Sequence, residues 1–249
     1  MKVLAIESSC DDTSIAIVND DKSVEFLETI NHRKFHKDLG GVIPEMAARQ
    51  HLEILDILGK SIKKINFSKI SAIAATFGPG LIGGLIVGSS FAKGLSISKN
   101  IKLVPINHLQ AHLLSPRLVS EIKFPYLCLL VSGGNTALVL VKNSKSFITL
   151  GSTIDDSAGE CFDKVAKGLG LGYPGGPELE HLALGGNIEK FKLPMPLTKK
   201  NNCDFSFSGL KTAALNTIKN NKKTKSFLRD FSASFQHTCL LYTSDAADD

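Results

Sequence analysis

The chain has 249 residues, of which 43% are hydrophobic and 21% charged, so it can bury a core without disulfide staples. Its 29 Lys and Arg residues against 24 Asp and Glu give a net charge of +5, a mild excess that permits a nucleic-acid partner without requiring one. The lack of Trp argues against a base-stacking platform built on indole rings. The cysteines are scattered, the N-terminus lacks a signal-peptide pattern, and no run is suited to a membrane span. We therefore expect a cytoplasmic protein that does not associate with a membrane.

The sequence predicts two similar rounds of secondary structure, each of which begins with a meander of strands and continues with helices. In the first, we expect strands at 2–7, 14–19, 24–30, 71–76 and 102–106, and helices at 44–64, 81–98 and 108–120. In the second, we expect strands at 126–131, 136–142 and 146–150, and helices at 157–169, 177–184, 209–220 and 225–235. This is a mixed α/β plan with an internal duplication, and we place its boundary near residue 107, which gives lobes of 1–107 and 108–238.

A polar turn stands at the same place in each round, at residues 8–13 and 132–136. Each turn alone is more simply an ordinary hairpin, but their matching positions support each other. Hydroxyls and backbone N–H groups at such turns can hold phosphate oxygens, and Asp11 could hold a metal or a water beside them. Two such turns that face each other across a cleft clamp a phosphate chain in the actin, Hsp70 and sugar-kinase superfamily, and we predict that arrangement here.

His108 and His112 are spaced to share one face of a helix that directly follows a strand. Two imidazoles so placed can chelate one metal ion, although a chance pair is the alternative. Zinc proteases with this spacing need Glu directly after the first histidine as a general base, and Leu109 occupies that position. The pair therefore predicts a metal site without protease chemistry of that kind.

The stretch 155–164 predicts the start of a helix that serves a ligand. Ser157 and Glu160 have the spacing of a capping box, which is the structural explanation for both. Asp163 lies one turn further along and could bond a ligand hydroxyl. The glycine turn at 172–177, which includes Gly176, could bring backbone to the same ligand, with a plain turn as the alternative.

These pieces occur in an order that resembles one family. The blocks that carry the resemblance are 6–13, 40–51, 78–81, 107–112, 130–136, 155–164, 173–177 and 204–212. Together they resemble the tRNA N6-adenosine threonylcarbamoyltransferases, once labelled O-sialoglycoprotein endopeptidases, over residues 1 to about 238. The resemblance implies an α/β fold that is a duplicated ATPase-superfamily (actin/Hsp70/sugar-kinase-like) fold, here with an incomplete second lobe.

The resemblance also implies roles for named residues. His108 and His112 would bind Fe2+, with zinc as the alternative, and Asp11 would orient or deprotonate the attacking amine. The donor threonylcarbamoyl-adenylate would contact a set spread over the second round: Leu130, Val131, Ser132, Gly133, Gly134, Asp163 and Gly176. Its threonylcarbamoyl group would pass to N6 of the adenosine 3′ of the anticodon, in tRNAs that read codons beginning with A.

The expected partners are tRNA, a paralogous inactive subunit and a small P-loop ATPase. The chain departs from the family at Asn135, where many relatives have His, and at Gln110, where many have Glu. Neither position is a metal ligand in this interpretation.

Residues 239–249 have no likeness to the family, which continues with an adenosine-contacting segment and an Asp that is the third metal ligand. They read as one translated frame of a common short-read library adapter. We therefore expect a non-native tail that projects from the body with few contacts, except for a helical extension through Leu241, and a chain that is a fragment.

Two other functions fit parts of the pattern. A sugar or acetate kinase would use the two turns for ATP but has no use for the histidine pair. A non-catalytic subunit of the modification complex would share the fold and could lose both histidines, and their presence argues against it.

Overall fold

The computed structural model describes residues 1–32, 42–62, 65–197 and 202–248, with no side chains described for 244–248. The chain forms two compact units, Met1–Ile122 and Lys123–Asp249. Residues 108–122, which we expected to open the second lobe, therefore cluster with the first unit. The first two residues of the block 40–51 and the last two residues of the predicted helix 44–64 lie outside the described residues.

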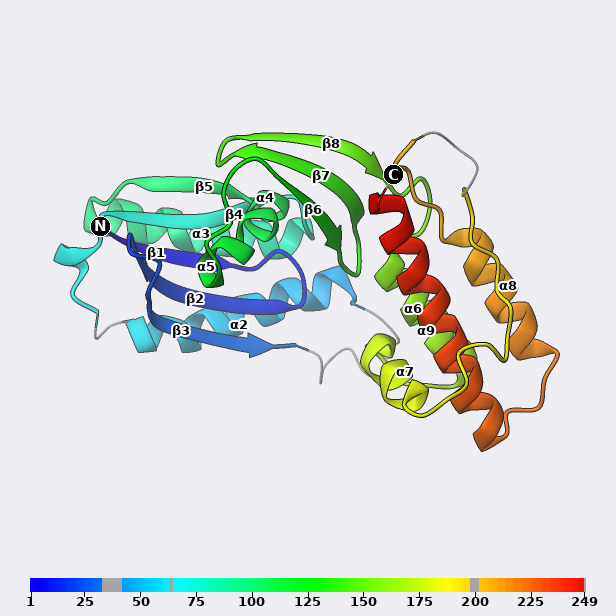
Figure 1. The fold of residues 1–249 in the computed structure, drawn as a ribbon. Helices are drawn as coiled ribbons and strands as arrows, with labels where there is room; N and C mark the ends of the chain where they lie inside the picture. The colour runs from blue at the N-terminus through cyan, green and yellow to red at the C-terminus, as the bar shows by residue number, and fades with distance from the viewer. Residues whose placement is uncertain (33–41, 63–64, 198–201, 249) are drawn as a thin grey trace. The chain divides into compact units, whose positions relative to one another are not determined.

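The first unit is built on a five-stranded sheet with the order β3-β2-β1-β4-β5 (Figure 1). Strands β1 (Lys2–Glu7), β2 (Asp12–Asn19) and β3 (Val24–Asn31) form the predicted antiparallel meander. Strands β4 (Ala72–Gly78) and β5 (Leu103–Asn107) add in parallel beside β1. Because parallel strands end at the same edge, the carboxyl ends of β1, β4 and β5 meet there.

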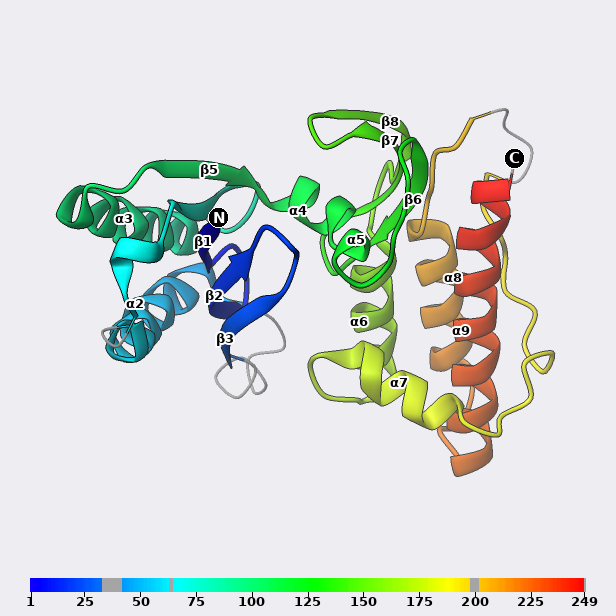
Figure 2. The same ribbon diagram turned by 60° about the vertical axis from the view of Figure 1, so that its left-hand side comes forward.

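Two long helices, α2 (Pro44–Ser61) and α3 (Ile82–Lys99), pack against each other and against this sheet (Figure 2). Alternate side chains of the strands supply the buried face, with Leu4, Ile15 and Ile73 fully buried against Leu55 and Leu58 of α2. A 3-10 turn, η3 (Phe67–Lys69), precedes β4. The predicted helix 108–120 is divided into α4 (His108–Leu114) and α5 (Pro116–Val119), because Pro116 cannot continue the hydrogen-bond ladder of α4.

The second unit repeats the meander as β6 (Tyr126–Val131), β7 (Thr136–Asn143) and β8 (Ser146–Ser152), in the order β6-β7-β8. Four helices follow: α6 (Ala158–Leu169), α7 (Gly175–Ala183), α8 (Ser208–Lys219) and α9 (Lys225–Asp248). A cluster of fully buried phenylalanines forms the centre of this unit: Phe205, Phe207, Phe231 and Phe235. The predicted duplication of a meander followed by helices is thus present.

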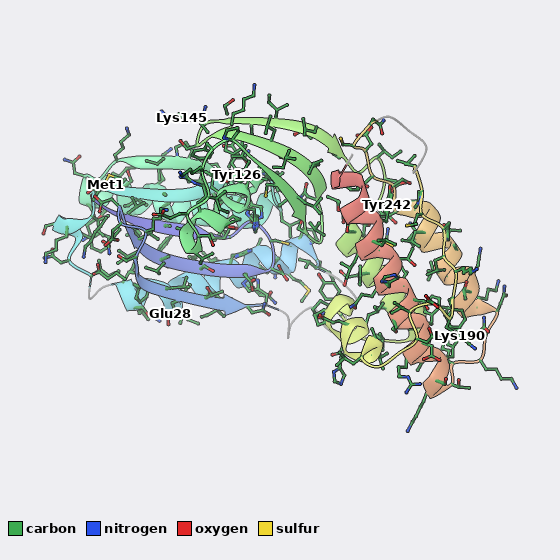
Figure 3. All side chains as sticks on the ribbon, viewed as in Figure 1. Met1, Glu28, Tyr126, Lys145, Lys190 and Tyr242 are labelled. Atoms are coloured by element: carbon green, nitrogen blue, oxygen red, sulfur yellow. The ribbon has the colours of Figure 1, made fainter. Side chains whose placement is uncertain are left out.

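The expectation that the tail projects with few contacts is wrong for residues 239–243. Cys239 and Tyr242 are 1% and 3% exposed and belong to the core of the second unit. Tyr242 lies near the end of α9 (Figure 3), packs edge-on against Phe205 and Phe207, and its hydroxyl accepts a hydrogen bond from the Ser206 N–H at 2.9 Å. The helix continues because these side chains extend the apolar stripe of α9.

No helix among the residues that the structure describes is both long and apolar enough to cross a membrane.

Candidate active site

The turn at 8–13, between β1 and β2, has its backbone held by three other elements. Three successive carbonyl oxygens each accept a hydrogen bond: Ser9 from Leu81 N at 2.7 Å, Cys10 from His51 Nε2 at 3.0 Å, and Asp11 from His32 N at 2.9 Å. These donors come from the start of α3, from α2 and from the end of β3. A turn fixed in this way presents the half-exposed Asp11 side chain in one place.

Glycines of α3 let the helix approach this turn closely. A Cβ on Gly84 would lie 2.3 Å from the Ser8 carbonyl oxygen, and one on Gly88 would lie 1.9 Å from Ser8 Oγ. Both distances are shorter than a real Cβ contact. The Ser8 hydroxyl instead donates a hydrogen bond to the Gly84 carbonyl at 2.9 Å, so Gly84 and Gly88 allow α3 to lie directly against this turn.

His108 and His112 present their rings to one point. Their Nε2 atoms are 3.1 Å apart, and the ring centroids are 4.5 Å apart in an edge-on arrangement. Two metal bonds of about 2.0–2.1 Å that meet at roughly 90–110° hold two nitrogens about 2.9–3.4 Å apart. The pair therefore has the spacing of two ligands on one ion, as the i, i+4 pattern predicted. α4 begins right after β5, with Asn107 as its cap, so the sheet edge fixes the position of both rings.

Glu7 completes this corner of the first unit, and the sequence reasoning missed its contribution. Its carboxylate lies 3.3 Å from His108 Nδ1, accepts the Ser9 N–H at 2.6 Å, and accepts a hydrogen bond from Thr76. Burial opposes ionisation of Glu7, but the hydrogen bonds from His108, Ser9 and Thr76 lower its pKa to about 2. An ionised Glu7 that accepts Nδ1–H leaves the Nε2 lone pair of His108 for a metal, the usual arrangement around histidine ligands. Ser9 Oγ also contacts His108 Nδ1, at 3.0 Å.

The topology could have revealed Glu7. It ends β1, Thr76 lies near the end of β4, and His108 follows β5, so parallel pairing brings all three to one edge. Over residues 1–32, 42–62, 65–197 and 202–243, no group of three or more His, Cys, Asp and Glu side chains is placed to hold a metal ion. The first unit thus offers two nitrogen ligands and an orienting carboxylate.

The turn at 132–136 carries the second predicted site. The Ser132 N–H donates to the Asn135 carbonyl at 2.8 Å, and the Asn135 N–H returns a bond to Ser132 Oγ at 3.0 Å. An added Cβ on Gly133 or Gly134 would meet nothing within 4 Å, so both glycines leave the backbone open to a ligand.

Helix α6 starts against this turn and connects it to the second glycine turn. Ser157 Oγ accepts from the Glu160 N–H at 3.2 Å, as the capping pattern predicted, and donates to the Gly133 carbonyl at 2.7 Å. One helical turn further on, Asp163 Oδ1 accepts the Gly175 N–H at 2.8 Å. Within the second unit, α6 therefore connects three predicted parts of the site. Its start contacts the turn at 132–136, and its Asp163 contacts the segment that contains Gly176. That this turn faces the turn at 8–13 stays a prediction.

The remaining acidic residues of the block 155–164 have structural roles. Asp155 Oδ1 accepts the N–H groups of Phe207 and Ser208, at 2.7 and 3.2 Å, at the start of α8. Asp156 forms ion pairs with Lys164, at 3.0 Å, and with Lys211. The block 204–212, which contributed to the family resemblance, is thus tied to the block 155–164 by these two carboxylates.

The fold is similar to solved structures of low sequence identity. The (R)-2-hydroxyglutaryl-CoA dehydratase component A of Acidaminococcus fermentans aligns with all of this chain and 78% of its own, with a TM-score of 0.53 at 13% identity. The activator of 2-hydroxyisocaproyl-CoA dehydratase from Clostridium difficile, solved with bound ADPNP, covers all of this chain and 75% of its own, with a TM-score of 0.51 at 12% identity. This likeness agrees with the predicted α/β fold.

Sequence relatives are much more similar. The tRNA N6-adenosine threonylcarbamoyltransferase of Wolbachia pipientis wMel is 50% identical over 237 residues, which are 94% of this chain and 70% of the relative. Those of Rickettsia canadensis and Gluconobacter oxydans are 48% and 47% identical, over 95% and 99% of this chain and 70% and 71% of theirs. The family model described as tRNA N6-adenosine threonylcarbamoyltransferase matches residues 25–248, so the match extends into residues 239–248, where we expected no likeness to the family. The chain belongs to the tRNA N6-adenosine threonylcarbamoyltransferase family.

Proposed function

We propose that this tRNA-modifying transferase acts through a metal ion held by His108 and His112, and that it passes the threonylcarbamoyl group of threonylcarbamoyl-adenylate to N6 of the adenosine 3′ of the anticodon. The acceptors would be tRNAs that read codons beginning with A. The observation that carries the proposal is the 3.1 Å separation of the two Nε2 atoms beside the ionised Glu7. This corner supplies two nitrogen ligands in fixed orientation, which suits Fe2+ or zinc. The bound metal would supply a Lewis acid that polarises the carbamoyl carbonyl.

The chain's own residues would then perform the proton transfer. A bond forms between N6 of adenosine and the carbamoyl carbon, the bond from that carbon to the adenylate oxygen breaks, and AMP leaves with the electron pair. N6 loses a proton in this exchange. Asp11 is the predicted base, and its turn contacts His108 through Ser9, so we assign it the task of orienting and deprotonating the amine.

The second unit would bind the donor. Leu130 to Gly134 end in an open glycine backbone, where an adenylate could lie without meeting side chains. Asp163 uses Oδ1 to hold the Gly175 N–H, which would leave Oδ2 for a ribose hydroxyl. Gly176 has free space where a Cβ would stand, and so admits the ligand at the start of α7. The partners we propose are tRNA, which the net charge of +5 favours, and, on the resemblance, a paralogous inactive subunit and a small P-loop ATPase.

Metal binding by purified variants tests this proposal. Titration calorimetry with Fe2+ under anaerobic conditions, and with Zn2+, should give one site in the wild-type chain. His108→Ala and His112→Ala should lose that site while keeping the wild-type circular dichroism, because neither ring lies in the core. His181→Ala is the control, since His181 is an exposed histidine of the second unit. Unchanged metal affinity in His108→Ala would refute the site, and transfer to tRNA by the assembled complex should fail in the same variants.

A further inference from the structure

A chain of three buried polar side chains lies under the turn at 8–13. Thr13 Oγ1 is 2.9 Å from His32 Nε2 and 2.7 Å from His51 Nδ1, and all three residues are 0% exposed. The other nitrogen of His51, Nε2, lies 3.0 Å from the Cys10 carbonyl oxygen. Neither histidine belongs to the site residues predicted from the sequence. Buried polar groups of this kind are costly unless every bond is made, so their arrangement needs an explanation.

The bonding partners determine where the protons are. A carbonyl oxygen only accepts, so His51 Nε2 must carry the proton that it gives to Cys10. Burial lowers the pKa of His51, and it outweighs the opposing effect of the Cys10 carbonyl and of the Glu7, Asp11 and Asp12 carboxylates. The ring is therefore neutral, and its Nδ1 carries no proton. The centroid of the His32 ring lies 4.5 Å away, where a second positive charge would add repulsion.

A bare Nδ1 must accept, and among the residues that the structure describes the Thr13 hydroxyl is the group placed to donate to it. That hydroxyl has a single proton, so its other contact, with His32, must be one that it accepts. His32 Nε2 is therefore protonated. The chain of donors runs in one direction, from His32 to Thr13 to His51 to the Cys10 carbonyl.

We propose that His32, Thr13 and His51 are positioning residues. Their one-way hydrogen-bond chain holds the turn at 8–13 in a fixed position relative to the His108 ring. The Cys10 carbonyl that receives the last bond lies between Ser9, whose hydroxyl contacts His108 Nδ1 at 3.0 Å, and Asp11. The neighbouring helix has a glycine against this ring, because a Cβ on Gly84 would lie 2.8 Å from His51 Nε2. The positioning role rests on the proposed function, since it concerns the proposed base and a proposed metal ligand.

The first test needs no variant. Long-range ¹H–¹⁵N correlation spectra of the imidazoles in the whole 249-residue chain distinguish protonated from bare ring nitrogens. We expect His51 to be neutral with its proton on Nε2, and His32 to be protonated on Nε2. A proton on His51 Nδ1, or a bare Nε2 on either ring at neutral pH, would overturn the proposal.

The second test uses matched substitutions. Thr13→Val keeps the shape but removes both bonds, Thr13→Ser keeps the hydroxyl, and Ile17→Val is a core change further along β2. We expect the His108 ring signals to shift in Thr13→Val and to stay at their wild-type positions in the other two. Thr13→Val should also lose roughly 4–10 °C in Tm, against about 2–3 °C for Thr13→Ser, which lacks only a methyl group.

His108 signals that respond equally to Thr13→Val and Ile17→Val would show general loosening and reject the positioning role. Wild-type protein that binds neither Fe2+ nor Zn2+ would instead refute the proposed metal site. The proton assignments would still be decided by the spectra, so the two failures are distinguishable.

Discussion

Replacing Gly84 with alanine should destabilise the protein, whereas the same change at Gly94 of the same helix should stabilise it. Alanine is better than glycine inside a helix by about 0.5–1 kcal/mol, and both positions gain this amount. At Gly94 nothing lies within 4 Å of the new methyl group. At Gly84 the methyl group would be 2.3 Å from the Ser8 carbonyl oxygen and 2.8 Å from the His51 ring.

The difference between the two variants isolates the steric cost, because the helix propensity cancels. Overpacking of a close-packed site costs about 1–3 kcal/mol, and the obstacle at Gly84 is backbone that cannot rotate away. We expect Gly84→Ala to unfold at a lower urea concentration than Gly94→Ala by that free energy, with about 2–4 °C in Tm for each kcal/mol. Urea unfolding followed by circular dichroism measures both. Equal stability of the two variants would refute the close contact between α3 and the turn at 8–13.

Two further predictions concern Asp155 and Asp156, whose carboxylates contact the start of α8. Asp155→Ala should lower the free energy of unfolding by about 1–2 kcal/mol in urea denaturation, because the Phe207 N–H at the helix start loses its acceptor. Burial opposes ionisation of Asp156, but Lys211 and Lys164 outweigh it, so its folded pKa lies below the ordinary value of 3.8. The stabilising effect of Asp156 should therefore be complete well above pH 3.8 and be lost as the pH falls through the folded pKa. Over that range, the difference in free energy of unfolding between wild type and Asp156→Asn should become smaller. A gap that stays constant with pH would contradict the ion pairs.

Local patterns in the sequence were sufficient for the elements and for pairs within one element. Alternating apolar residues predicted β1 and β2, and the i, i+4 spacing predicted that His108 and His112 converge. Such patterns are short in range, and the geometry of one strand or helix fixes their outcome.

Contacts between elements could not be read in the same way. His51 lies on a helix, where a lone buried histidine has no sequence signature, and its partner Thr13 is 38 residues away. Glu7 was visible as the end of a strand, but its contact with His108 spans 101 residues and depends on the parallel order of β1, β4 and β5. The boundary near residue 107 was placed by the repeat, whereas α4 and α5 belong to the first unit, Met1–Ile122.

The end of α9 shows what an argument from composition can miss. Beyond Tyr242 the chain has no large apolar residue, which suggested a projecting tail, but the helical stripe of Phe231, Phe235, Cys239 and Tyr242 continues at spacings of four, four and three. Cys239 and Tyr242 thereby face the core. Sequencing the genomic DNA beyond Thr238 would test the origin of these residues.

Tyr242→Ala should be severely destabilising. The ring is 3% exposed, its centroid lies 6.2 and 5.5 Å from those of Phe205 and Phe207, and its hydroxyl accepts the Ser206 N–H. Removing a buried aromatic ring costs about 3–5 kcal/mol, and removing the hydroxyl alone, in Tyr242→Phe, about 1 kcal/mol. Leu240→Ala is the control on the same helix, because Leu240 is 56% exposed, and its effect should stay within about 0.5 kcal/mol. Urea unfolding of the three variants should rank them in that order, and a Tyr242→Ala protein as stable as Leu240→Ala would mean that the end of α9 does not hold the core of the second unit together.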